Sequence, residues 1–162
     1  MKYAKQALSI FLICFVLIFA SMLTGCKGTN DLTPSTLTKN ICATLELNEL
    51  TSLSGSNLPA HFQIQDTDIK RFSVLIDSSS SSADTVAAFE VIDDKQQTAV
   101  VTGISSYITK LTTSFENTIT SEYQKTQNRI LVKIDNIILL VISANPESLE
   151  EYLSSLSAQP IY

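Results

Sequence analysis

Three cysteines and one histidine are the residues of this 162-residue chain best suited to nucleophilic chemistry. His61 is the only histidine, so any serine or cysteine nucleophile that needs an imidazole base must use it. Cys42 is the only cysteine after Cys26, and nothing in its spacing from His61 brings the two together. We expect Cys42 to be a buried helical residue, His61 to be a surface residue, and the chain to have no catalytic residues.

Other patterns that carry chemistry are incomplete. Asp66-Thr67-Asp68 begins like a calcium-binding loop, but the glycine and the bidentate glutamate that should follow are missing. The serine run 78–82 lacks the Gly-x-Ser-x-Gly setting of a nucleophile elbow, and four scattered glycines cannot form a phosphate-cradling loop. We therefore expect neither a metal nor a cofactor.

Cys26 follows a segment with the layout of an export signal. Residues 1–6 contain Lys2 and Lys5, residues 7–23 are almost entirely apolar, and Leu23-Thr24-Gly25-Cys26 then resembles the lipobox of bacterial lipoproteins. In that motif small residues let a peptidase close on the bond before the cysteine, whose thiol carries a diacylglyceryl group. We expect a signal peptide at 1–25 with Leu23, Thr24 and Gly25 as recognition residues, and lipid on Cys26.

This interpretation predicts the chain's address. Residues 26–34 would form a lipidated tether, and a single domain at 35–162 would lie at the extracytoplasmic face of the membrane. The alternative is an uncleaved membrane-spanning helix, for which residues 7–23 are at the lower limit of length. In both cases the remaining chain faces outward.

The charge of the chain limits its partners. All 16 acidic residues and all but two of the 11 basic residues follow Cys26, and the whole chain has a net charge of −5. Such a surface repels nucleic acid and anionic lipid alike, so nucleic-acid binding is disfavoured and the lipid must provide the membrane attachment.

The hydrophobic period predicts the elements of the domain. Spacings of three to four residues indicate helices, and alternation indicates strands. The expected order is a helix capped by Thr33 or Ser35, a hairpin, a long helix, a second hairpin and a closing helix that starts at Asn145-Pro146. The strands fall at 70–77, 85–92, 130–134 and 137–142, and the long helix runs from Lys95 to about Phe115.

These elements predict an α+β fold with a mostly antiparallel four-stranded sheet and helices packed on it. Residues 137–142 are apolar at every position, so both faces of that strand should be covered. Either the first or closing helix covers the second face, as in most domains, or a partner chain does, which would make the protein a homodimer or a subunit of a complex.

The layout also resembles a known family. Residues 82–91, the long helix with Phe115 and Tyr123, and residues 129–149 are similar to small lipoproteins of clostridial Firmicutes that carry an uncharacterised domain, domain of unknown function 4358. The similarity covers roughly residues 35–156. It departs at Asp135-Asn136-Ile137, where a glycine turn and an aromatic residue are expected, and in lacking a proline motif after Tyr123. The resemblance implies a fold and a Gram-positive cell-surface address, but no activity.

Three functions are consistent with these observations. The first is a membrane-anchored, non-enzymatic binding or accessory lipoprotein with a protein or small-molecule partner. The second is an enzyme that acts on cell-envelope material with His61 or an acidic pair as base, and the third is a purely structural envelope component. A deep pocket that holds His61 or two converging carboxylates would favour the second, and the absence of both a pocket and a ligand would favour the third.

Overall fold

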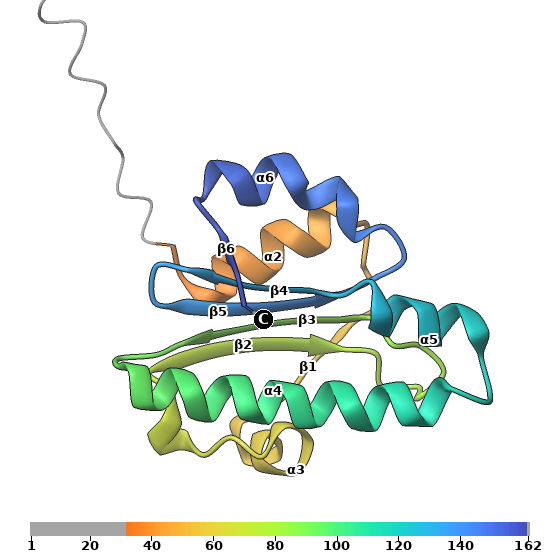
Figure 1. Ribbon diagram of the computed structural model, residues 1–162, viewed down its shortest axis with the longest axis horizontal. Helices are drawn as coiled ribbons and strands as arrows, with labels where there is room; N and C mark the ends of the chain where they lie inside the picture. Colours follow the sequence, from red (N-terminus) through yellow and green to blue (C-terminus); the bar gives the residue numbers. More distant parts are fainter. Residues whose placement is uncertain (1–31, 162) are drawn as a thin grey trace, which may run out of the picture. The chain divides into compact units, whose positions relative to one another are not determined.

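The computed structural model of the protein describes residues 32–161, which build one antiparallel sheet with helices on both faces (Figure 1). The sheet has six strands in the order β1-β2-β3-β5-β4-β6. The strands are β1 Thr51–Ser52, β2 Arg71–Ile76, β3 Thr85–Glu90, β4 Ile130–Ile134, β5 Ile137–Ile142 and β6 Gln159–Pro160. The helices are α2 Pro34–Thr44, α3 Leu58–Phe62, α4 Asp94–Phe115, α5 Thr120–Gln127 and α6 Glu150–Ser155, with 3₁₀ turns η1 Gly55–Asn57, η2 Asp66–Asp68 and η3 Pro146–Leu149.

The two longest helices begin where the sequence predicts. The Thr33 side chain accepts a hydrogen bond from the Thr36 amide (3.1 Å), and Pro34 occupies the first helical position of α2. Asp93 caps α4 by accepting from the Gln96 amide (2.8 Å). Both helices then present an apolar stripe to the sheet.

The sheet separates two apolar clusters. Alternate residues of the central strands, such as Val86 and Leu139, pack with α2, η3 and α6 on one face. Phe89 and Ile138 are among those that pack with α3 and α4 on the other face. Figure 1 shows the two helical layers on opposite sides of the sheet. The second face of β5 is therefore covered by helices of the same chain, which was the first of the two expected alternatives.

The predicted sheet size was wrong, because the sheet has six strands and not four. β1 pairs with β2 and β6 pairs with β4, so each hairpin gains a two-residue edge strand. Such short strands are exposed and too brief to show alternation. Pro160 lies opposite Val132, and the next residue, Ile161, donates its amide to the Leu131 carbonyl (3.0 Å). The N–H that proline lacks is therefore at a position of β6 that does not need to bond to β4.

Two local features were not predicted. A separate helix α5 starts after Ile119, which lies in the connection that follows α4, and Tyr123 is part of α5. In the β4–β5 turn the positive φ (51°) belongs to Asp135. The neighbouring Asn136 donates its side-chain amide to Glu90 Oε1 (3.1 Å), so this residue ties the turn to β3.

Several predictions lie outside the described residues. The signal peptide 1–25, its recognition residues Leu23, Thr24 and Gly25, lipid attachment at Cys26 and most of the tether remain predictions from the sequence. Among residues 32–161, no helix combines the length and apolar character needed to cross a membrane.

Candidate binding groove along strand β4

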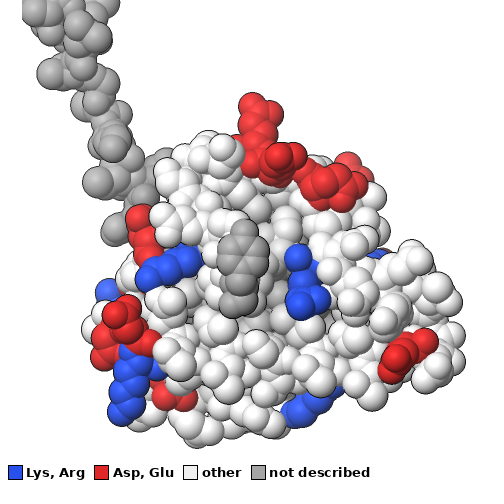
Figure 2. All heavy atoms as spheres, viewed as in Figure 1, with Lys and Arg blue, Asp and Glu red and all other residues white. Residues whose placement is uncertain are grey.

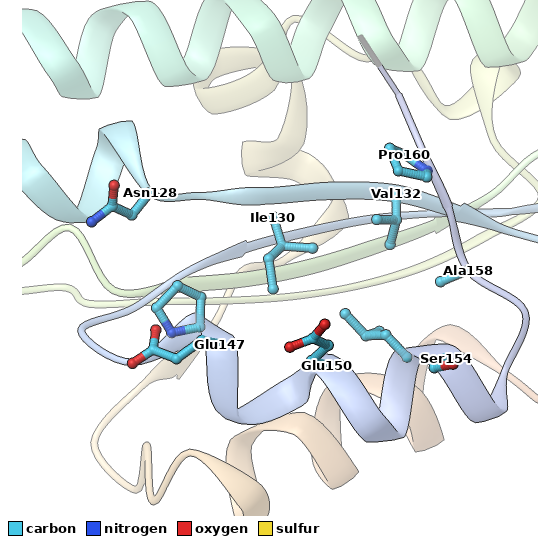
Figure 3. A pocket seen from close by; sticks show the side chains of 10 residues that line it. Asn128, Ile130, Val132, Glu147, Glu150, Ser154, Ala158 and Pro160 are labelled. Atoms are coloured by element: carbon cyan, nitrogen blue, oxygen red, sulfur yellow. The ribbon is translucent and has the colours of Figure 1, made fainter.

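A groove of about 690 Å³ lies between strand β4 and the closing helix (Figure 3). Figure 3 shows Ile130 and Val132 projecting from β4 toward α6, with Glu147 and Glu150 on the helical side. We call this hollow the β4 groove, and it is lined by Asn128, Ile130, Val132, Pro146, Glu147, Glu150, Leu153, Ser154, Ala158 and Pro160.

The local sequence explains the shape of the groove. Alternation along β4 places Ile130, Val132 and Ile134 on the face toward α6, where Val132 and Ile134 are buried and Ile130 is half-buried. The helical spacing of η3–α6 places Leu149 and Leu153 against the sheet. The groove therefore has an apolar floor under a rim of helix residues.

The groove adjoins a strand edge that is only partly covered. β6 pairs with Val132 and Lys133, and among the described residues no strand lies beside Ile130 on that edge. A second hollow of about 620 Å³ lies between β4 and α4 and shares Ile130, Val132 and Pro160 with the β4 groove. Both hollows thus follow the same strand edge.

The charge at the groove is acidic. Figure 2 shows carboxylates gathered over α6, and Glu147, Glu150 and Glu151 are exposed there. Glu147 and Glu150 are the only ionisable side chains among the described residues that line the groove. The rim therefore favours a ligand with a positive charge beside an apolar surface.

The residues that the sequence singled out for nucleophilic chemistry lie apart. Cys42 is half-buried on α2 against one apolar cluster, and burial raises the pKa of its thiol. His61 is exposed on α3, which packs on the opposite face of the sheet. The fold therefore does not bring this nucleophile and base together.

The acidic pair at Asp66 and Asp68 has a local structural role. These residues form the 3₁₀ turn η2 before β2, and the Asp68 carboxylate accepts from the Gln65 amide (2.9 Å). No group of three or more histidine, cysteine, aspartate or glutamate side chains in the described part of the chain is arranged to hold a metal ion.

One polar cluster was not predicted. Lys125 Nζ lies 3.0 Å from both Asp84 Oδ2 and Glu122 Oε2, and Glu122 also accepts from the Ala83 amide (2.8 Å). Burial by itself would raise the pKa of the Glu122 carboxyl, but the Ala83 amide and Lys125 bring this pKa below its ordinary value. Burial likewise opposes the charge of Lys125, but Asp84 and Glu122 raise its pKa above the ordinary value. Glu122 and Lys125 thus favour their charged forms, and the cluster joins α5 to the start of β3.

Comparison with known proteins identifies the family only. The family described as Domain of unknown function (DUF4358) matches residues 43–143, from the end of α2 to the end of β5. No curated protein and no solved structure matches the chain. The match includes β4, whereas η3, α6 and β6, which complete the groove, lie beyond it. Because the match covers more than half of the sequence, the chain belongs to the DUF4358 family, whose domain has no known function.

Proposed function

We propose that this protein is a lipid-anchored, non-catalytic binding protein at the extracytoplasmic face of the membrane. Its ligand is an extended peptide segment of a partner protein, held in the β4 groove. The observation that carries the proposal is the combination of an apolar floor, two rim carboxylates and a strand edge that no strand of residues 32–161 covers at Ile130. The address rests on the sequence Leu23-Thr24-Gly25-Cys26.

The pairing of β6 supports an extended ligand. A short segment of the chain already lies antiparallel along β4, with Gln159 opposite Lys133 and Pro160 opposite Val132. An incoming peptide can use the same mode on the part of the edge around Ile130, where backbone groups supply affinity and the flanking hollows receive alternate side chains. One hollow would receive apolar side chains over Ile130 and Val132.

The rim carboxylates support a basic residue in the ligand. Glu147 and Glu150 face the groove, and the part of the lining that the structure describes contains no lysine or arginine. A lysine or arginine of the peptide would pair with them, which adds selectivity for a cationic, apolar segment. An acidic peptide would be repelled by the same two side chains.

A photo-crosslinking amino acid at Ser154 tests the groove in the full-length lipidated chain in native membranes. Ser154 is exposed and lines the groove, and Ser121 is a matched control because it is exposed on α5 and is not one of the lining residues. We expect an adduct from position 154 alone, and the partner peptide attached to it should be apolar and contain a lysine or arginine. Equal adducts from both positions would contradict the proposal.

Charge variants provide the second arm of this test. Glu147→Gln combined with Glu150→Gln should reduce the adduct severalfold, since the ligand loses both rim charges. Glu151→Gln lies on the same helix, does not line the groove and should leave the adduct unchanged. An adduct that is equally strong in all three proteins would show that the rim does not select the ligand.

The anchor is tested separately. Labelled palmitate should enter the wild-type chain and should be absent from a Cys26→Ser variant, because that thiol is the proposed acceptor. Equal labelling of both proteins, or recovery of the unmodified chain from the cytosol, would refute the anchor and leave the groove experiment unaffected.

A further inference from the structure

A small polar pocket lies at the end of the sheet where β3 begins and β5 ends. Thr85 pairs with Ile142, so the antiparallel register brings the next residues outward, Asp84 and Ser143, to the same place. We call this hollow of about 240 Å³ the Asp84 pocket. It is lined by Thr44, Leu45, Glu46, Leu47, Asp84, Ser143, Ala144, Asn145 and Ser148, and it shares no lining residue with the β4 groove.

Two polar atoms at this pocket are buried without a partner. Ser143 is only 2% exposed, and its Oγ has no hydrogen-bond partner within residues 32–161. The same holds for Asp84 Oδ1, although the other oxygen of this carboxylate accepts from Ser82 (2.8 Å) and Lys125 (3.0 Å). Folded proteins rarely leave such atoms unsatisfied, because each costs about 1–3 kcal/mol. A group that donates hydrogen bonds to both atoms would relieve this cost.

The charge around the pocket favours a cation. Lys125 is shared between Asp84 and Glu122, so one ammonium serves two carboxylates. The last turn of α2 reaches the pocket at Thr44, and the negative end of the helix dipole adds to the same potential.

An adjoining hollow extends this acidic surface. It measures about 380 Å³, shares Glu46, Leu47 and Asp84 with the Asp84 pocket, and adds Glu49 and Asp77. The described residues that line the two hollows include four carboxylates and neither lysine nor arginine. A linear ligand with a positive charge at each end would therefore find an acidic environment along its whole length.

Size and donor number point to the class of ligand. A volume of 240 Å³ exceeds the roughly 30 Å³ that one water molecule occupies in the liquid, so the pocket accepts an organic group. An alkylammonium has three N–H donors and no acceptor, which matches the two unsatisfied acceptor atoms on residues that line the pocket. We propose that the Asp84 pocket binds one ammonium group of a short linear polyamine, with Asp84 Oδ1 and Ser143 Oγ as acceptors. Its second ammonium group lies among Glu46, Glu49 and Asp77.

Calorimetry on the full-length chain in detergent tests this site with 1,4-diaminobutane, butylamine, potassium chloride and calcium chloride as probes. We expect the diamine to bind more tightly than the monoamine, and neither salt to reproduce the signal. Ser143→Ala should weaken both amines about tenfold or more, the effect of losing a hydrogen bond to a charged group. This change removes an unpaired buried hydroxyl, so the fold should tolerate it, and Ser121→Ala is the matched control.

Glu49→Gln separates the two halves of the site without touching the core, because Glu49 is exposed. It should weaken the diamine about threefold and leave the monoamine unchanged, as expected for one exposed charge pair. The proposal is overturned if neither amine binds, if Ser143→Ala binds both like the wild type, or if only the salts bind. A crystal structure grown with the diamine that shows only water at Asp84 Oδ1 and Ser143 Oγ would also overturn it.

Discussion

Replacing Gly103 with alanine tests how closely α3 approaches α4. Gly103 is buried in the middle of α4, and an added Cβ would lie 2.3 Å from the Phe62 carbonyl oxygen and 2.7 Å from Ile64 Cγ1. The nearest atom is backbone, so no rotamer change relieves the contact. The segment 62–64 would have to move by about 1 Å to restore an ordinary separation.

The expected cost is larger than the gain in helix propensity. Alanine is preferred over glycine in a helix by about 1 kcal/mol. Overpacking a filled core costs about 1–3 kcal/mol and occasionally more. Phe62 is fully buried, stacks on Tyr107 with ring centroids 4.2 Å apart and meets Phe89 edge-on at 5.5 Å, so moving it disturbs the core. Because the clash is with backbone, we expect the upper end of this cost, about 3 kcal/mol. After the propensity gain of about 1 kcal/mol, Gly103→Ala should lower the free energy of unfolding by about 2 kcal/mol, or the melting temperature by about 8 °C.

Urea unfolding followed by far-ultraviolet circular dichroism measures this change, since the chain has no tryptophan. Thr102→Ala is the matched control, because Thr102 is the exposed neighbour on the same helix. It should gain a few tenths of a kcal/mol from propensity alone. If Gly103→Ala is as stable as Thr102→Ala, α3 and α4 do not approach each other as closely as in this structure.

Two further predictions concern buried charges. Hydrogen bonds from Arg71, and then from Lys70 and Asn136, hold the pKa of Glu90 at about 2, below its ordinary 4.5. Glu90→Gln should therefore lower the free energy of unfolding by about 2 kcal/mol at neutral pH, a figure reduced because the two cations are half-exposed. The stabilisation is fully present above pH 4.5 and is lost as the pH falls toward 2. The free energies of unfolding of the wild type and Glu90→Gln, measured by urea titration, should therefore converge over that interval. A difference that stays constant with pH would contradict this pKa. Lys125→Met leaves two carboxylates without their cation and should cost about 2 kcal/mol in thermal unfolding. Adding Glu122→Gln should recover part of that loss, and no recovery would show that the cluster does not act through charge.

Local patterns predicted most of the fold because they reflect burial on one face. The alternation of β2 and β4 and the stripe of α4 follow directly from apolar residues that face a core, and the structure contains all three elements. Two-residue strands carry no such pattern, so the pairing of Thr51–Ser52 and Gln159–Pro160 depends on long-range contacts alone. For this reason the local sequence pattern could not predict a six-stranded sheet.

Both candidate binding sites depend on pairings that local patterns do not contain. The sequence predicted two hairpins, but it did not predict that β3 of one pairs with β5 of the other. That register alone brings Asp84 and Ser143 together, and Lys125 reaches Asp84 from 41 residues away. The β4 groove likewise needs β6, whose Pro160 argues locally against a strand. The apolar residues of this chain could thus be assigned to a core from their spacing, whereas the polar residues of the two proposed sites come together only in the observed strand order.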